Sequence, residues 1–234
     1  MDRRRFVKTC GLGAGLAAGA ALAASGEVRA QRHQRVRLVG TDGAPLRASL
    51  LGVGEPYVFH YPFAATPCFL VDLGRSVAGR LGLATEQGER YDWPGGVGAA
   101  RSVVAYSAIC AHRMAHPTRT LSYISYRAAR GNGDPDTGVI SCCAENSVYD
   151  PALGAAVLSG PAPQPLATIV LEHDPESDAL HAVGTLGGAM FQRFFEEFAL
   201  RLSLEHPSRD LAAPLPDDVP TLPLSEFTAN VVGC

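Results

Sequence analysis

Two short segments near the middle of the chain combine residue types that bind iron. Cys110 and His112 lie two positions apart in the first, and the second holds Cys142 with Glu145 three positions later. A cysteine and a histidine at this spacing, on a tight loop at the end of a strand, can reach two adjacent metal ions. A two-iron, two-sulfur (2Fe-2S) cluster is held in this way, with thiolates on one iron and imidazoles on the other. The two segments therefore predict a pair of loops that hold such a cluster.

The pattern around these residues resembles the Rieske iron–sulfur family. In that family one loop carries Cys-x-His and the other carries Cys-x-Cys-His-x-Ser-x-Phe/Tyr-Asp. Aligning Ser147, Tyr149 and Asp150 with the end of the second motif places Cys142 at the second thiolate. The match is good over residues 100–170. Flanking segments, such as FHYP and VAYS before the first loop, are similar to the small, Rieske-type subunits of periplasmic arsenite oxidases.

The resemblance implies a role for each residue of the two loops. The cluster ligands would come two from each loop: Cys110, His112, Cys142 and Glu145. In the family, hydroxyls at the positions of Ser147 and Tyr149 donate hydrogen bonds to a bridging sulfide and to a cysteine sulfur. Such donors raise the reduction potential of a cluster. Gly160 and Pro161 fall on the proline-rich loop that lies beside the cluster.

The sequence departs from the family pattern in three places. Many Rieske proteins join the two loops by a disulfide, and the corresponding positions here hold Ala115 and Ala144. The position of the second histidine ligand holds Glu145. The chain between the loops, roughly Thr118 to Gly138, is longer than usual, which gives room for a lid or a docking surface.

Glu145 leaves several hypotheses open. A carboxylate is a competent ligand for ferric iron, and its negative charge would make the cluster harder to reduce. Alternatively, His116 or Cys143 supplies the fourth ligand. In a third hypothesis no cluster is bound and the fold serves as a scaffold, since losing one ligand is often enough to lose a metal. Zinc is a further alternative, because two cysteines, a histidine and a glutamate satisfy a tetrahedral site.

The elements that must position these loops are predicted to be short strands. From Val36 onward, apolar segments alternate with turn signals, as in antiparallel β-proteins. Eight segments are predicted as strands: 35–39, 57–61, 68–73, 102–109, 121–126, 138–142, 167–172 and 179–183. Residues 91–100 and 128–136 are predicted as loops. The expected fold is all-β, a Rieske-type antiparallel β-sandwich with a small cluster-binding subdomain at about 105–165.

A helix and an extended tail are predicted at the C-terminal end. Over residues 189–205, apolar side chains that include Phe191 and Phe194 recur at helical spacing. Residues 208–234 are rich in proline and without a period, which predicts an extended tail that wraps its own domain or a partner. Cys234, the last residue, is interpreted as an incidental thiol.

The first thirty residues have the features of a targeting signal. Consecutive arginines, which include Arg4 and Arg5, precede a weakly apolar run that ends in a small-residue cleavage site at 28–30. Paired arginines before such a run are the twin-arginine export pattern. The sequence therefore predicts a signal peptide at 1–30, a Rieske domain at 31–188 and a C-terminal region at 189–234, in a periplasmic protein. Membrane association is expected only if the leader is retained as an anchor.

Composition and motifs narrow the function. Hydrophobic residues make up 47% and charged residues 18% of the chain, which supports a packed core and excludes wholesale disorder. The net charge of -3 gives no basic field for nucleic acid. By resemblance, the chain is expected to carry electrons between a larger redox subunit, such as a molybdenum oxidase, and a c-type cytochrome, without catalysing a reaction itself. The alternatives are a cluster-free docking subunit and a zinc-stabilised binding module.

Overall fold

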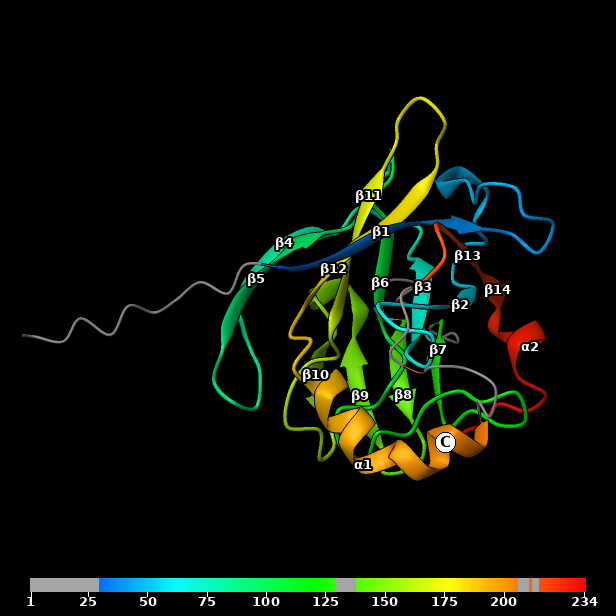
Figure 1. Ribbon diagram of the computed structural model, residues 1–234. Coiled ribbons are helices and arrows are strands. Elements are labelled where there is room, and N and C mark those ends of the chain that lie inside the picture. The colour runs from blue at the N-terminus through cyan, green and yellow to red at the C-terminus, as the bar shows by residue number, and fades with distance from the viewer. Residues whose placement is uncertain (1–29, 129–137, 206–210, 212–214) are drawn as a thin grey trace, which may run out of the picture.

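The computed structural model describes residues 30–128, 138–205, 211 and 215–234. It contains an eight-stranded sheet, a four-stranded sheet and a two-stranded hairpin (Figure 1). The predicted signal peptide, apart from Ala30, and the predicted loop at 128–136, apart from Ala128, lie outside the described residues. None of the helices in the described part of the chain is long and apolar enough to cross a membrane.

The large sheet curls until its two edges meet. In spatial order its strands are β13 (Asp218–Pro220), β1 (Gln31–Val39), β12 (Leu180–Leu186), β11 (Thr168–His173), β6 (Val103–Ser107), β3 (Pro67–Asp72), β2 (Pro56–His60) and β14 (Leu222–Pro223). Neighbouring strands are antiparallel except β1 and β13, which are parallel. Only Thr221 separates β13 from β14, although these strands form opposite edges, and β13 also contacts β2.

The large sheet packs on both faces because its central strands are apolar throughout. Successive side chains of a strand point to opposite faces, and in β3 Cys68 and Leu70 join one core while Phe69 and Val71 join the other. The first core contains the buried face of helix α1 (Met190–Glu205). The second core contains the side chains of the four-stranded sheet.

The four-stranded sheet carries the second candidate loop. Its order is β10 (Ala156–Ser159), β9 (Ser147–Asp150), β8 (Val139–Cys142) and β7 (Ile124–Arg127), with all neighbours antiparallel. Cys142 is the last residue of β8 and pairs with Ser147, the first residue of β9. The hairpin register therefore fixes which residues form the tip between them.

The predicted loop at 91–100 is wrong over its first half. Residues Arg90–Gly95 form β5, which pairs with β4 (Ala78–Ala84) in a hairpin. Trp93 is only 3% exposed, and its ring lies 6.1 Å from that of Tyr106. Burial of this indole stabilises a strand whose glycines and exposed Pro94 are typical of a loop in the sequence.

The predicted helix at the C-terminal end is confirmed as α1, and the all-β fold class is confirmed with it. The tail differs from an extended tail, because it supplies β13, β14 and the short helix α2 (Leu224–Phe227). The tail packs on its own domain, which was one of the two alternatives predicted from the sequence; the other was packing on a partner. The remaining elements are two short 3-10 helices, η1 (Ala48–Leu50) and η2 (Pro151–Leu153).

The buried face of α1 gives a direct test of this packing. Phe194 is fully buried in the first core, so Phe194→Ala is expected to lower the free energy of unfolding by about 3–5 kcal/mol. Leu200 lies on the same helix and is 77% exposed, so Leu200→Ala is the matched control, with an expected change within about 0.5 kcal/mol. Urea unfolding curves measure both values; equal effects would contradict the packing of α1.

Candidate metal centre

Two loops meet at the second core, which contains both Cys110 and Cys142. Loop 1 (residues 110–116) follows β6, and it closes on itself because Cys110 N–H donates to Ala115 O at 2.8 Å and Met114 N–H donates to Cys110 O at 3.0 Å. Loop 2 (residues 142–147) is the β8–β9 connection. Cys110 and Cys142 are both free thiols and fully buried, and their Sγ atoms hydrogen-bond to each other. The structure thus brings together the two predicted thiolate ligands.

Each cysteine sulfur accepts backbone hydrogen bonds from the same relative positions. The N–H groups of His112 and Arg113, two and three residues on, donate to Cys110 Sγ. The N–H groups of Ala144 and Glu145, again two and three residues on, donate to Cys142 Sγ. Successive N–H groups directed at one point form a concave site that stabilises negative charge, as at many iron–sulfur sites.

The two loops also share a backbone conformation that side chains rarely adopt. The fourth residue after each cysteine has a positive φ, which is 55° at Met114 and 58° at Asn146. Such conformations are uncommon outside glycine and cluster at functional sites. Loops 1 and 2 are therefore two matched turns that present their sulfur atoms to each other.

The electrostatics of the pair follow from this arrangement. The Cys142 thiol donates a hydrogen bond to Cys110 Sγ and, against the opposing effect of burial, lowers the pKa of Cys110 to about 5. The same interaction, together with burial, raises the pKa of Cys142. One buried negative charge opposes a second beside it, so the fully ionised pair requires a bound cation.

Tyr149, on β9, stands where the resemblance implies a donor to a cysteine sulfur. Its hydroxyl lies 3.3 Å from Cys110 Sγ and accepts the N–H of Ala111 at 3.2 Å. Burial, followed by the negative charge of Cys110, raises the pKa of Tyr149. The phenol therefore remains a hydrogen-bond donor to the sulfur.

Two buried polar atoms of these loops lack a hydrogen-bond partner. They are Ser147 Oγ and His112 Nδ1, two of five such side-chain atoms in the described part of the chain. A buried polar atom without a partner costs about 1–3 kcal/mol, and histidine ring nitrogens are the commonest protein ligands of metal ions. Together with the paired sulfurs of Cys110 and Cys142, these atoms form a donor set that fits a 2Fe-2S cluster.

Glu145 lies across from loop 1 and binds Arg113. The Glu145 Oε1–Arg113 Nε distance is 3.4 Å, and the glutamate side chain is 41% exposed. Among the described residues, no three His, Cys, Asp or Glu side chains surround one point as a single metal ion would require. The predicted role of Glu145 as a cluster ligand stays a prediction.

The two alternatives for the fourth ligand are wrong. Cys143 forms a disulfide with Cys234, 91 residues later, so neither is a free thiol and Cys234 is not incidental. His116 is buried under α1, where its Nδ1 lies 2.9 Å from Met114 O and its Nε2 lies 3.2 Å from Glu205 Oε2. Both of its nitrogens are occupied away from the sulfurs.

The segment at 160–161 lies against loop 2, as the resemblance implies. Gly160 has a φ of 90°, and a Cβ at this position would overlap the carbonyl oxygen of Asn146 and the Cα of Ser147. Gly160 and Pro161 are both exposed. The close approach explains the need for glycine, and the cluster-binding role of the two residues stays a prediction.

Residues of α1 that the sequence patterns do not single out also hold loop 1. Arg193 Nη2 donates to the carbonyl oxygen of His112 at 3.1 Å, and the same side chain binds Glu197 at 2.7 Å. Figure 1 shows α1 lying across the end of the molecule near the four-stranded sheet. The contact with His112 joins residues 81 positions apart, so no local motif signals it.

No family model matches the chain. Among solved structures, the chain is similar to the soluble domain of Rieske protein II (soxF) from Sulfolobus acidocaldarius. The identity is 27%, the match covers 65% of this chain and 78% of the other, and the TM-score is 0.47.

The hydrogen bond from Tyr149 is expected to set the acidity of the metal-free site. Tyr149→Phe removes a donor to Cys110 Sγ and leaves the Ala111 N–H without its acceptor, so the pKa of Cys110 is expected to rise from about 5. The ultraviolet absorbance of the thiolate, followed against pH in metal-free protein, measures the midpoint. Tyr126→Phe is the control, because Tyr126 is not among the groups that shift Cys110. An unchanged midpoint in the Tyr149 variant would contradict this role.

The contact between His116 and Glu205 is expected to give a pH-dependent stability. The hydrogen bond from His116 and then that from Arg201 lower the pKa of Glu205 from 4.5 to about 2. Because the folded pKa is depressed, the stabilisation is complete above pH 4.5 and is lost as the pH falls towards 2. Glu205→Gln is expected to cost about 1 kcal/mol at neutral pH and almost nothing near the lower limit.

Urea unfolding at several pH values measures this difference. The matched control is Glu196→Gln, because Glu196 is an exposed glutamate on the same helix that accepts a hydrogen bond from Gln192. A cost for the Glu205 variant that does not change with pH would show that the carboxylate charge is not what stabilises the contact.

Proposed function

We propose that the chain is a Rieske-type electron-transfer protein that holds a 2Fe-2S cluster between loops 1 and 2. One observation carries the proposal: Cys110 and Cys142 each begin one of two matched turns. In each turn the backbone N–H groups two and three residues after the cysteine donate to its sulfur, and the residue four positions after it has a positive φ. Electron transfer by this group needs one site that accepts and releases single electrons, and the bound cluster would supply it.

The residues of the chain would bind the cluster and adjust its potential. Cys110 and Cys142 would be the thiolate ligands, His112 Nδ1 the imidazole ligand and Glu145 the fourth. The backbone N–H donors and the Tyr149 hydroxyl stabilise negative charge on sulfur, and the unpartnered Ser147 hydroxyl would do so for a bound cluster, which favours reduction. The carboxylate of Glu145 opposes them, because it places negative charge where an imidazole is neutral.

We extend the proposal to the setting of the protein. It would act in the periplasm after twin-arginine export, between a larger redox subunit such as a molybdenum oxidase and a c-type cytochrome. The leader at residues 1–30 supports export. The Cys143–Cys234 disulfide also supports it, since disulfides persist mainly in oxidising compartments. His112 is only partly buried, which makes it the residue through which electrons would enter or leave.

A cluster-free docking subunit is the second candidate. The observation that favours it is the contact of Glu145 with Arg113, which occupies the carboxylate at the position of the missing histidine. In this case the fold would present α1 and the tail to a partner. The two candidate functions predict different iron contents, so measuring the iron in one protein preparation distinguishes them.

The proposal predicts about two irons and two acid-labile sulfides per chain in protein recovered from its native export route. An electron paramagnetic resonance spectrum after dithionite reduction identifies the cluster type, and the mass of the recovered chain shows whether residues 1–30 are removed. Folded, colourless protein without iron would support the docking subunit, and zinc in place of iron would support the zinc module.

Glu145→His tests the fourth ligand. Exchanging a charged ligand for a neutral one is expected to raise the midpoint potential, by on the order of 100 mV, with iron retained. Glu176→His, on the exposed turn between β11 and β12, adds the same imidazole away from the loops and serves as the control. If neither iron content nor spectrum nor potential changes in the Glu145 variant, Glu145 does not touch the cluster.

A further inference from the structure

The last seven residues of the chain lie alongside the segment that comes after loop 1 in the sequence. We name residues 228–234 the C-terminal strap. Its Ala229 N–H donates to Arg119 O at 3.0 Å, Ser122 N–H donates to Asn230 O at 2.9 Å, and Val232 N–H donates to Ser122 O at 2.9 Å. These bonds attach the strap along residues 119–123, which begin three residues after the end of loop 1.

The end of the strap is attached to loop 2. Cys234 is bonded to Cys143, which directly follows Cys142, and their Cα atoms are 5.3 Å apart, within the ordinary range of a disulfide. The backbone N–H of Cys143 also donates to Tyr123 O at 2.7 Å. Residues 119–123, the strap and loop 2 are therefore joined to one another.

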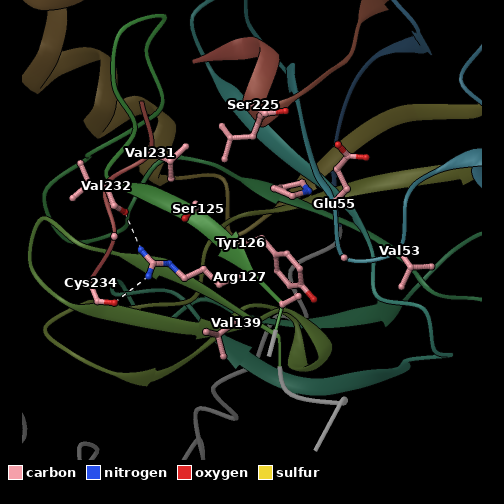
Figure 2. Close-up of a pocket in the computed structure, with 15 residues that line it drawn as sticks. Val53, Glu55, Ser125, Tyr126, Arg127, Val139, Ser225, Val231, Val232 and Cys234 are labelled. Atoms are coloured by element: carbon pink, nitrogen blue, oxygen red, sulfur yellow. Dashed lines mark hydrogen bonds between the residues drawn. The ribbon is translucent and has the colours of Figure 1, made fainter. Parts of the chain in front are cut away.

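Arg127, on β7, holds the strap end from the side. Its guanidinium donates to Val232 O at 2.8 Å and to Cys234 O at 3.0 Å, as Figure 2 shows. The same group lies 3.0 Å from Cys143 Sγ. Beside it is a groove of about 1090 Å³, whose wall includes the strap from Val231 to Cys234. The contacts of Arg127 therefore hold both cysteines of the disulfide and the strap residues next to it in place.

The strap connects the two loops at a place where no direct covalent link exists. The positions at which the family resemblance implies an inter-loop disulfide hold Ala115 and Ala144. A polar side-chain contact between the loops is the partly exposed ion pair of Arg113 and Glu145. Exposed ion pairs contribute little to stability. A disulfide that closes a chain segment of 91 residues restricts the unfolded and locally opened states far more.

We propose that the C-terminal strap, closed by the Cys143–Cys234 disulfide, fixes loop 2 against loop 1 and keeps Cys142 Sγ opposite Cys110 Sγ. It takes the place of an inter-loop disulfide. Loop 2 is a hairpin tip with exposed residues at 144–146, and such tips open locally with little cost. The strap removes this freedom at the residue next to the sulfur. Only its consequence for cluster retention rests on the function proposed above.

Amide hydrogen exchange tests the strap without requiring a cluster. The N–H groups of Ala144 and Glu145 bind Cys142 Sγ only while loop 2 holds its turn. In Cys143→Ser/Cys234→Ser protein, exchange over residues 142–147 is expected to be at least roughly tenfold faster, with β1 and β12 unchanged. Gly233→Ala is the matched control, because a Cβ there meets nothing within 4 Å and the disulfide remains. Unchanged exchange in the double variant would overturn the proposal.

Two further measurements keep the test decisive. Alkylation and peptide mapping of the unreduced wild-type chain should find Cys143 and Cys234 linked, and free thiols at both would overturn the proposal even if the double variant fails to fold. Adding Ala115→Cys and Ala144→Cys to the double variant should restore slow exchange in loop 2, because it installs the direct link.

Cluster retention separates this proposal from the function. With a cluster present, iron release to a chelator should be at least roughly tenfold faster in the Cys143→Ser/Cys234→Ser protein than in Gly233→Ala, and slow again in the variant with the direct link. A wild-type chain without iron, but with exchange that depends on the disulfide, would overturn the proposed function alone. A chain with a cluster, and with exchange and iron release that ignore the disulfide, would overturn the strap alone.

Discussion

Two thiols buried within hydrogen-bonding distance of each other impose the constraint on which the rest of the site depends. The Cys142 thiol, the Tyr149 hydroxyl and the backbone N–H groups lower the pKa of Cys110 and so favour its thiolate. The interaction with Cys110 raises the pKa of Cys142 and so favours its neutral thiol. Such a pair is stable as two thiolates only around a cation. The matched turns, with Met114 and Asn146 in left-handed conformations, accept backbone strain in order to direct N–H groups at the sulfurs.

Turns of this kind need support from outside, and the C-terminal region supplies it to both. Helix α1 contacts loop 1 through His116–Glu205 and through Arg193 on the His112 carbonyl oxygen. The strap and its disulfide contact loop 2 at Cys143. The region after residue 188 therefore acts on the site from two directions. It also closes the large sheet, since β13 and β14 occupy its two edges.

The general fold followed from local patterns, and its exceptions have physical reasons. Alternating apolar segments identified the core strands because each face of a strand is buried separately, as β3 shows with Phe69 and Leu70 in different cores. The sequence patterns did not predict the hairpin of β4 and β5, because Pro94 and its neighbouring glycines are typical of loops. In the structure, burial of Trp93 outweighs this local preference. The strands of the tail were hidden for a related reason: each has two or three residues, too few to show a period.

The sequence, through its resemblance to the Rieske family, predicted the sulfur pair, the Tyr149 hydroxyl beside Cys110 Sγ and the place of Gly160 beside loop 2, because the residues that carry the resemblance stand at fixed short spacings. Only the tertiary structure decided the fate of Cys143, His116 and Cys234. Their partners lie 91, 89 and 91 residues away, and the pairing depends on how the sheets and α1 bring those segments together. The local sequence around a cysteine or histidine does not indicate whether its side chain will bind a metal, a carboxylate or another sulfur.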